Sequence, residues 1–198
     1  MPRRSPAWNE VLYCALDLET SGLEPRTDEI LSLAMVPIRD GVIRFGERFA
    51  SLVRPADPAG LSLAGLPAHQ LLPRDLAAAP PLAGLLPEVD RRLRAAVPVL
   101  HHAPLDLGFL RRAYRRAGLD WPRPAVVDTV VLLRRLDVRH LLLAPHPAPL
   151  PLGLAAARAA VGLPAYPNHL APIDALATAE LFLALRSRLG AERLRDLT

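Results

Sequence analysis

The sequence contains no lysine, so all 24 of its basic residues are arginine. This bias, together with 22 prolines, is typical of a GC-rich genome or a hot habitat. Arginine suits bidentate contacts to phosphate, but a bias that affects every basic position does not identify a phosphate site. The single cysteine, Cys14, excludes an internal disulfide and with it a secreted disulfide scaffold. Cys14 lies in an apolar run, where we expect it to be a small core residue.

Aromatic residues and long apolar runs are also scarce. Only 5% of the chain is aromatic, which argues against the extended stacking platforms of single-strand binders. No uninterrupted apolar run approaches the roughly 18 residues of a membrane span, and the N-terminal segment reaches Asp17 before a signal-like apolar region is complete. We therefore expect a soluble, cytoplasmic protein with no membrane partner.

The chain does have enough apolar sequence for a substantial core. With 198 residues and 51% hydrophobic content, it suits one globular domain over residues 1–198. The net charge of +4 and the isoelectric point near 10.1 are compatible with a polyanionic partner, but many proteins without such a partner are equally basic. Composition alone therefore leaves the partner open.

The pattern of expected elements changes along the chain. Residues 11–17 indicate a central strand, and residues 29–53 hold two strand-like runs around Asp40-Gly41, a dipeptide that favours a tight hairpin. Residues 55–81 are a long connection with one short helix. We then expect helices at 81–97, 105–118, 154–163 and 173–189, a strand at 98–102, a strand running into a helix at 125–136, and an extra turn within 191–197. This order predicts an α/β fold, with three antiparallel strands and then parallel strands in one mixed sheet flanked by helices.

Two acids stand one residue apart at the end of the first strand, in the stretch YCALDLETSGL at residues 13–23. Residues i and i+2 of a strand share a face, so Asp17 and Glu19 place two carboxylates side by side. Like charges repel there unless a cation or protons intervene. The pair is weak evidence by itself, because an exposed strand end or a helix cap explains most such pairs.

Two later segments carry further acids. Asp106 follows a strand at the start of an amphipathic helix, and Asp174 opens the last helix five residues after His169. Taken separately, helix capping explains each acid, and a solvated loop explains His169. Taken together, they are what phosphodiester hydrolysis with two metal ions requires: several hard oxygen ligands and a base near the attacking water.

Three motifs carry these residues: DLETSGL at residues 17–23, HHAPLDLGFL at 101–110 and HLAPIDA at 169–175, with VVDTVVLLRRL between the last two. In these motifs and their order, the chain resembles the DnaQ-like family of 3'-5' exonucleases. This family is the DEDDh branch of the ribonuclease H-like superfamily and includes the proofreading subunit of bacterial DNA polymerase III. The resemblance extends over about residues 13–185, within a motif-bearing core at about 11–190, and implies a ribonuclease H-like fold.

The resemblance also implies roles for individual residues. Four carboxylates would ligate two Mg²⁺ or Mn²⁺ ions: Asp17, Glu19, Asp106 and Asp174. His169 would be the general base, a role that suits an imidazole because it titrates near neutrality. Thr20 and Leu23 would hold the terminal nucleotide, with main-chain contacts to its sugar and an apolar wedge under its base. His102 is a further candidate contact to the substrate.

The chain departs from the family's motifs at four positions. Ser21 replaces a threonine, His102 stands where asparagine is usual, and Leu105 replaces a phenylalanine. Pro172 stiffens the backbone between the base and the last carboxylate. All five catalytic residue types are present, so we expect activity, whereas the geometry at the substrate end and the substrate preference stay open.

Other conspicuous residues have structural interpretations that we prefer. We expect Asp128 to cap the following helix, and His101 and His102 to pack at a strand end unless one of them touches nucleic acid. Trp8 and Trp121 should pack at the edges of the domain. Four arginines form a stripe at helical spacing, by default a solvated face and alternatively a phosphate-tracking surface: Arg111, Arg112, Arg115 and Arg116.

The resulting hypothesis is a metal-dependent 3'-5' exonuclease that releases nucleoside 5'-monophosphates from single-stranded nucleic acid, with DNA favoured over RNA. An exoribonuclease similar to oligoribonuclease or RNase T is the alternative within this class. A non-catalytic module that binds nucleic acid or a replication protein is the alternative outside it, and the joint occurrence of the acids with His169 argues against it. Replication or repair proteins are candidate partners, although the short sequence after the last helix favours a stand-alone enzyme.

Overall fold

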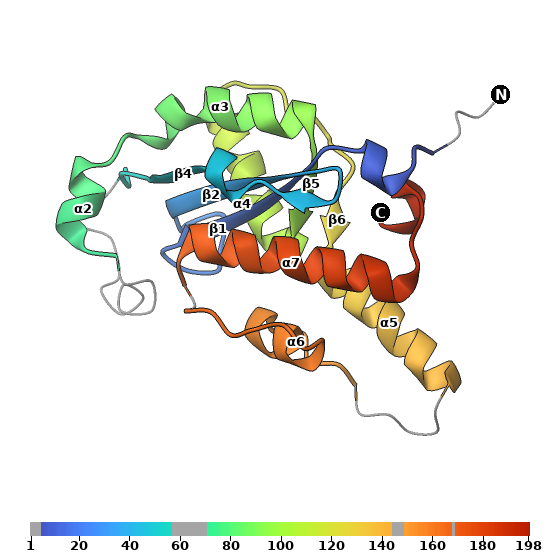
Figure 1. The fold of residues 1–198 in the computed structure, drawn as a ribbon. Coiled ribbons are helices and arrows are strands. Elements are labelled where there is room, and N and C mark those ends of the chain that lie inside the picture. Colours follow the sequence, from blue (N-terminus) through green and yellow to red (C-terminus); the bar gives the residue numbers. More distant parts are fainter. Residues whose placement is uncertain (1–4, 57–70, 144–148, 168) are drawn as a thin grey trace.

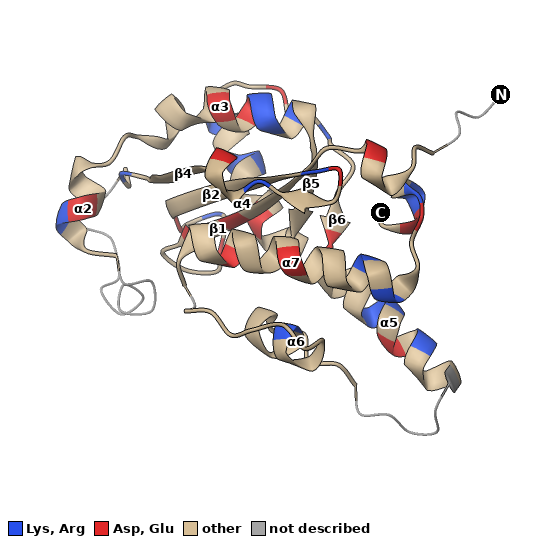
Figure 2. Ribbon diagram, in the orientation of Figure 1, with Lys and Arg blue, Asp and Glu red and all other residues tan. Residues whose placement is uncertain are grey.

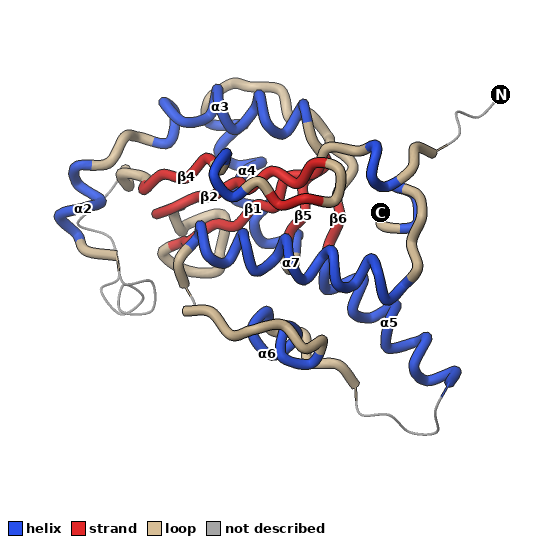
Figure 3. Tube along the Cα trace, viewed as in Figure 1, coloured by secondary structure: helices blue, strands red, loops and turns tan. Residues whose placement is uncertain are grey.

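The computed structural model describes residues 5–56, 71–143, 149–167 and 169–198. A central sheet lies between two layers of helices, with α3 and α4 on one face and α5, α6 and α7 on the other (Figures 1 and 3). The helices are α2 (Pro73–Ala78), α3 (Leu82–Ala95), α4 (Ala103–Arg116), α5 (Thr129–Leu143), α6 (Leu154–Ala160) and α7 (Ala171–Leu189), with 3-10 turns η1 (Trp8–Glu10), η2 (Phe45–Glu47) and η3 (Leu194–Asp196).

The described strands form one six-stranded sheet with the order β3-β2-β1-β5-β6, and β4 also pairs with β2. They are β1 (Tyr13–Thr20), β2 (Ile30–Arg39), β3 (Val42–Ile43), β4 (Phe49–Leu52), β5 (Val97–Leu100) and β6 (Val127–Asp128). Strands β1 to β4 pair antiparallel, whereas β5 pairs parallel to β1 and β6 parallel to β5. The predicted mixed α/β sheet flanked by helices is therefore confirmed.

The hairpin between β2 and β3 turns at the expected dipeptide, since Asp40 and Gly41 have φ angles of 53° and 73°. The second strand-like run is not one strand, however. The 3-10 turn η2 divides it into β3 and β4, because Arg44 bonds back to the carbonyl of Pro37 and the chain then turns before it rejoins β2. The predicted connection at 55–81 includes the short helix α2, and its residues 57–70 lie outside the described part of the chain.

Most helices begin and end close to the predicted positions, although α5 continues to Leu143, beyond the predicted segment 125–136. Two differences matter for the site. Both α4 and α7 begin two residues before the expected start, so that Pro104 and Pro172 fall in their first turns. Proline is tolerated there because the first turn's N–H groups have no intrahelical acceptor. Pro172 therefore starts α7 rather than stiffening a loop before it.

Alternation along β1 assigns its side chains to the two cores. Cys14 and Leu16 pack under α3 and α4, whereas Tyr13 and Ala15 pack under α7, with Tyr13 4.9 Å from the ring of Phe182. The prediction that Cys14 is a core residue is confirmed. Because the period is two, the side chains of residues 17 and 19 continue the face that α7 covers.

Among the described helices, none combines the length and the apolar character that crossing a lipid bilayer requires.

Candidate active site

Three carboxylates meet where β1 passes the first turn of α7. Ligand oxygens of Asp17, Glu19 and Asp174 all lie within 4.8 Å of one another. Figure 2 shows acidic residues on β1 and at the adjacent end of α7, two elements that are far apart in the sequence. The i, i+2 spacing on β1 does place two acids on one face, and the helix start supplies the third.

The start of α7 holds Asp174 in position. Its Oδ2 atom accepts hydrogen bonds from the backbone N–H groups of His169 at 2.8 Å and Leu170 at 3.3 Å. The N-cap of α7 is Leu170, so Asp174 is not the capping residue that the sequence suggested; its carboxylate instead accepts the N–H groups of the N-cap and of the residue before it. These hydrogen bonds do not exclude a ligand role, because Asp174 also lies within the carboxylate cluster.

Asp106 lies beside this cluster without being one of the three closest carboxylates among the described residues. It is 8% exposed in the first turn of α4, and burial raises its pKa by more than the nearby backbone of Leu18 on β1 lowers it. Its charge also interacts with those of Asp17 and Glu19. The structure thus brings all four predicted carboxylates to one region, with Asp106 on the side of α4.

Burial raises the pKa values of all four carboxyl groups, and the charges of neighbouring acids add to this rise for Asp17, Glu19 and Asp106. Burial raises the pKa of Glu19 to about 7, with a further rise from Asp174, and burial raises the pKa of Asp106 to about 7. The pKa of Asp17 lies well above its usual range because of burial and then the charges of Asp106, Glu19 and Asp174. Burial also raises the pKa of Asp174, although the two N–H groups that donate to its carboxylate lower it. Without a cation, the cluster holds protons near neutral pH.

These properties fit a divalent metal site. Carboxylate oxygens are the hard ligands that Mg²⁺ and Mn²⁺ prefer, and a cation removes the repulsion that otherwise keeps the groups protonated. The cluster Asp17, Glu19 and Asp174 can therefore bind metal, and Asp106 is near enough to take part electrostatically.

His169 stands at the entrance to α7 with its side chain exposed. It adopts a left-handed backbone conformation, with φ at 64°, and it precedes the N-cap residue Leu170. The charge of His169 lowers the pKa of Glu19, so the imidazole is electrostatically close to the cluster. A pocket of about 300 Å³ opens between this residue, Glu19 and Leu52.

Thr20 and Leu23 lie at the start of the loop that follows β1. The Thr20 hydroxyl donates to the carbonyl of Gly22 at 2.6 Å, while Leu23 is 79% exposed. The hydroxyl of Ser21 accepts the N–H of Glu29 at 3.0 Å, so the serine in place of threonine keeps a hydroxyl that closes the loop. Leu23 is thus available as an apolar surface, but its contact with a nucleotide stays a prediction.

Arg112, one of the four arginines at helical spacing on α4, holds this loop through hydrogen bonds. The guanidinium of Arg112 donates to the carbonyls of Pro25 at 2.7 Å and Asp28 at 2.6 Å. The contact is close, because a Cβ atom added at Gly108 would lie 2.9 Å from Pro25. We define residues 21–29 as the anchored loop. The only sequence signal for this anchor is the glycine one helical turn before Arg112, which is too weak to predict it.

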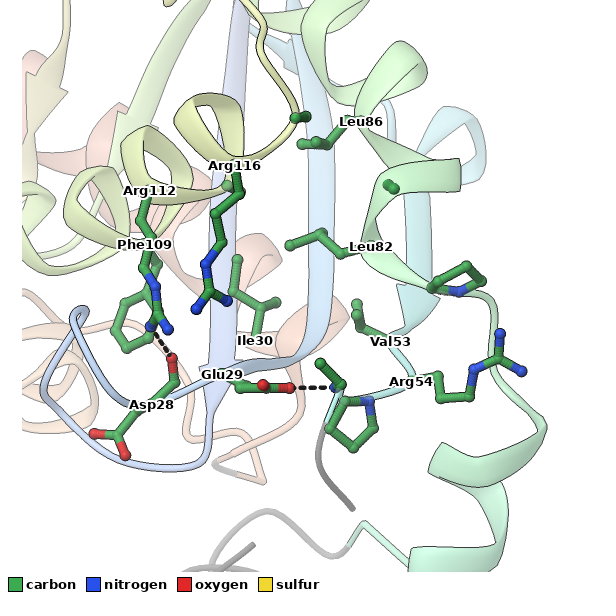
Figure 4. A pocket seen from close by; sticks show the side chains of 16 residues that line it. Asp28, Glu29, Ile30, Val53, Arg54, Leu82, Leu86, Phe109, Arg112 and Arg116 are labelled. Atoms are coloured by element: carbon green, nitrogen blue, oxygen red, sulfur yellow. Dashed lines mark hydrogen bonds between the residues drawn. The ribbon is translucent and has the colours of Figure 1, made fainter. Parts of the chain in front are cut away.

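A pocket of about 420 Å³ lies behind the anchored loop, on the α3 and α4 side of the sheet (Figure 4). Apolar side chains line most of it, and Figure 4 shows Arg112 bonded to Asp28 at one wall and Arg116 extending along another. The lining includes none of the four carboxylates, so this cavity is separate from the carboxylate cluster. Its apolar lining includes Ile30, Val53, Leu82, Leu86 and Phe109.

The residues at the ends of β5 and β6 are mainly structural. Asp128 accepts the backbone N–H groups of His102, Ala103 and Val130 at 3.1, 3.0 and 2.9 Å, which confirms that it caps the following helix and adds a link to α4. The ring of His101 contacts Thr129 Oγ1 and the carbonyl of Leu152, both at 2.8 Å, as expected for packing at a strand end. The role of His102 as a substrate contact stays a prediction.

The two tryptophans pack at the edges, as predicted. Trp8 lies under the guanidinium of Arg186 at 4.1 Å, and Trp121 meets the ring of Tyr114 edge to face at 5.0 Å.

The mixed sheet and the acidic cluster at the junction of β1, α4 and α7 define a hydrolase domain of the ribonuclease H-like exonuclease fold. The chain belongs to the exonuclease family RNase_T, whose family model matches residues 14–182.

Curated relatives agree with this assignment. The chain is 34% identical over 195 residues to a DNA polymerase III subunit epsilon-like protein of Rhodobacter capsulatus, covering 94% of this chain and 25% of the relative. It is 32% identical over 200 residues to a putative bifunctional exonuclease/endonuclease protein of Mycobacterium tuberculosis, covering 96% of this chain and 28% of the relative. The chain thus spans only about a quarter of the length of these relatives.

Solved structures share the fold at low sequence identity. A structure of exonuclease I superposes with a TM-score of 0.78 at 18% identity, covering 94% of this chain and 42% of the other. Exonuclease I of E. coli in complex with a dT13 oligonucleotide gives 0.74 at 18% identity, covering 91% and 42%. The cell-death related nuclease 4 gives 0.76 at 15% identity, covering 92% and 66%.

Proposed function

We propose that this domain is a metal-dependent 3'-5' exonuclease that releases nucleoside 5'-monophosphates from single-stranded nucleic acid. The observation that carries the proposal is the meeting of Asp17, Glu19 and Asp174 within 4.8 Å, with Asp106 and His169 beside them. An ordinary surface does not gather four carboxyl groups whose pKa values are all raised, because burial opposes the ionisation of each one. This set resembles the motif residues of DnaQ-like exonucleases.

The residues would divide the work by position. Asp17, Glu19 and Asp174, with Asp106 beside them, would hold two Mg²⁺ or Mn²⁺ ions. Such ions would supply charge neutralisation at the phosphate and activation of the attacking water. His169 would take the proton of that water, since its imidazole lies at the exposed rim of the cluster.

The substrate end would lie over the start of the anchored loop. The exposed side chain of Leu23 would slip under the terminal base, and the backbone near Thr20 would contact the sugar. His102 would be a further contact from the start of α4. A solved structure of exonuclease I contains a dT13 oligonucleotide, which supports single-stranded DNA as the substrate class to test first.

Partners and organisation are proposed by similarity. A relative named DNA polymerase III subunit epsilon-like supports a role with replication or repair proteins. Residues 1–198 would act as one exonuclease domain, in the cytoplasm.

The experiment is an exonuclease assay on a 5'-labelled single-stranded oligonucleotide. With Mn²⁺ or Mg²⁺ the protein should shorten it stepwise and release nucleoside 5'-monophosphates, and EDTA should stop the reaction. We expect Asp17→Asn and His169→Ala to lower the rate by about 100-fold or more, the size of effect usual for metal ligands and general bases. Asp120→Asn and His140→Ala are the matched controls, on an exposed loop and near the end of α5.

The outcomes separate the competing functions. Full activity in His169→Ala would contradict the role of His169 as the general base. Degradation that persists in EDTA would contradict the requirement for metal ions. Faster degradation of RNA than of DNA of the same sequence indicates an exoribonuclease. Binding without degradation at every metal concentration indicates a non-catalytic module.

A further inference from the structure

One buried arginine ties the connection before α7 to the body of that helix. Arg158 on α6 is 2% exposed. Its Nη1 donates to the carbonyl of Ala177 on α7 at 2.8 Å, and its Nη2 donates to the carbonyl of Pro164 at 2.9 Å. The same Nη2 lies 2.7 Å from Oε2 of Glu180, so a buried cation joins two elements and the segment between them.

Tyr166 completes this arrangement. Its ring lies under the guanidinium of Arg158, 4.6 Å from the ring centroid, and its hydroxyl donates to Oε1 of Glu180 at 3.0 Å. We call these three residues the arginine clamp: Arg158, Tyr166 and Glu180. The clamp fixes both the backbone and a side chain of the segment 161–167.

The proposed base follows this segment in the sequence, and residue 168 between them lies outside the described part of the chain. His169 follows Tyr166 by three residues, and the N–H groups of His169 and Leu170 donate to Asp174. The backbone of His169 is left-handed, a conformation that costs a non-glycine residue about 1 kcal/mol or more and persists only where the surroundings enforce it. Asp174 holds His169 directly through its N–H, and the clamp holds Pro164 and Tyr166 earlier in the sequence.

The clamp is poorly explained by stability alone. The Arg158 side chain is buried, whereas that of Glu180 is 25% exposed. Removing charges from water costs about as much as their attraction returns, so such an ion pair is often no better than apolar side chains of the same size. The arginine does impose an arrangement on the segment, because its two guanidinium nitrogens must reach the carbonyls of Ala177 and Pro164 together.

We propose that the arginine clamp is a positioning device that holds the segment before α7 so that His169 and Asp174 keep their places beside Glu19. The clamp residues are not among the proposed metal ligands, and they act by holding the segment before His169. Burial raises the pKa of Asp174, and the charge of Arg158 is among the effects that lower it. The catalytic part of this inference rests on the proposed exonuclease function.

The first test is kinetic. With saturating Mn²⁺, we expect Tyr166→Phe to lower kcat about 10-fold and Arg158→Met about 100-fold, with KM within about 3-fold, because a base displaced by about 1 Å loses its alignment but not the substrate's binding surface. In the His169→Ala background, Tyr166→Phe should change kcat less than 2-fold. Arg139→Met is the matched control: its guanidinium also donates to two carbonyls of α7, those of Arg188 and Leu189 at the far end, at 3.0 and 3.1 Å.

The second test needs neither metal nor activity. Hydrogen exchange of the His169 and Leu170 amides, followed by NMR, should be at least about 10-fold faster in Tyr166→Phe and Arg158→Met, and unchanged in Arg139→Met. Tyr166→Phe removes only one hydroxyl, so it still tests the proposal if Arg158→Met does not fold.

The proposal requires both results. Unchanged exchange in the clamp variants overturns it, and so does an equal loss of kcat from Tyr166→Phe with and without His169. If the wild-type chain degrades no oligonucleotide, the proposed function has failed, and the exchange measurement alone decides whether the clamp holds the segment.

Discussion

The four arginines on α4 have different roles, because each one has different neighbours in the fold. The spacing of Arg111, Arg112, Arg115 and Arg116 predicted one shared face, either solvated or in contact with phosphate. In the structure, Arg112 is bonded to carbonyls of the anchored loop, 87 and 84 residues earlier in the chain. Arg111 lies 5.7 Å from the ring centroid of Trp121, and Arg115 is exposed. Arginines at equivalent helical spacing therefore differ in role, because the spacing does not show which residues far away in the sequence each one contacts.

We predict that Arg112→Ala impairs substrate binding more than Arg115→Ala. Loss of the two carbonyl contacts frees the anchored loop that carries Leu23, so KM for an oligonucleotide should rise about 10-fold, the effect of losing roughly 1.4 kcal/mol of binding. Arg115→Ala removes the same charge from an exposed position and should change KM less than 2-fold at 0.15 M salt. Steady-state kinetics on one oligonucleotide measures both. Equal losses in the two variants would support the phosphate-tracking surface.

At the scale of elements, sequence patterns predicted the order of strands and helices, because burial on one or two faces leaves a period in the sequence. They also predicted that the acids lie at element ends: Asp17 and Glu19 near the end of β1, and Asp106 and Asp174 in the first turns of α4 and α7. They did not predict the break between β3 and β4, which depends on a turn whose partners are on β2. The arginine clamp was missed for the same reason, since alanine-rich sequence around Arg158 gives no sign of burial.

The contact between β1 and α7 supports a stability prediction. Tyr13 is 1% exposed, packs on Phe182, and its hydroxyl has no hydrogen-bond partner among the described residues. Burial accordingly raises the pKa of Tyr13 to about 12. Because an unsatisfied buried hydroxyl costs about 1 kcal/mol or more, Tyr13→Phe should raise the free energy of unfolding by about 1 kcal/mol.

Tyr114→Phe is the matched control for this change. Its hydroxyl donates to Oδ1 of Asp90 at 3.1 Å, so its removal should lower the free energy of unfolding by about 1 kcal/mol. Urea unfolding of both variants gives the two values. A loss of stability in Tyr13→Phe as large as that in Tyr114→Phe would mean that the Tyr13 hydroxyl is satisfied, for example by a buried water.

At the scale of the whole molecule, the net charge is positive, whereas the candidate active site is rich in acidic residues. The chain carries a formal charge of +4, yet its candidate active site gathers four acids whose pKa values are raised. Figure 2 shows the basic residues spread over several helices, among them α3, α5, α6 and the C-terminal end of α7, whereas acids stand on β1 and at the start of α7. The sequence predicted which residues form the site because three motifs contain them. It could not predict that Asp106 lies to one side, since that depends on how α4 docks against β1.

The acids also make the stability of the metal-free chain depend on pH, with a sign opposite to that of an ordinary paired carboxylate. The folded pKa of Glu19 is about 7 against 4.5 for the free side chain, so folding favours its protonated form. The stability that this preference contributes is present below about pH 4.5 and is lost as the pH rises through about 7. A shift of this size corresponds to about 3 kcal/mol, and the raised pKa values of Asp17 and Asp106 act in the same direction.

We therefore predict that the melting temperature of the EDTA-treated chain falls between pH 5 and pH 8, and that Mn²⁺ restores it most at pH 8, where a cation favours the ionised carboxylates. Glu19→Gln should flatten the pH dependence and weaken the effect of Mn²⁺. Glu192→Gln, at an exposed position, should leave both unchanged. Differential scanning fluorimetry over this pH range, with and without Mn²⁺, measures all three proteins. A melting temperature that rises with pH in EDTA, or an equal Mn²⁺ effect at pH 5 and pH 8, would mean that these carboxylates are already ionised in the metal-free fold.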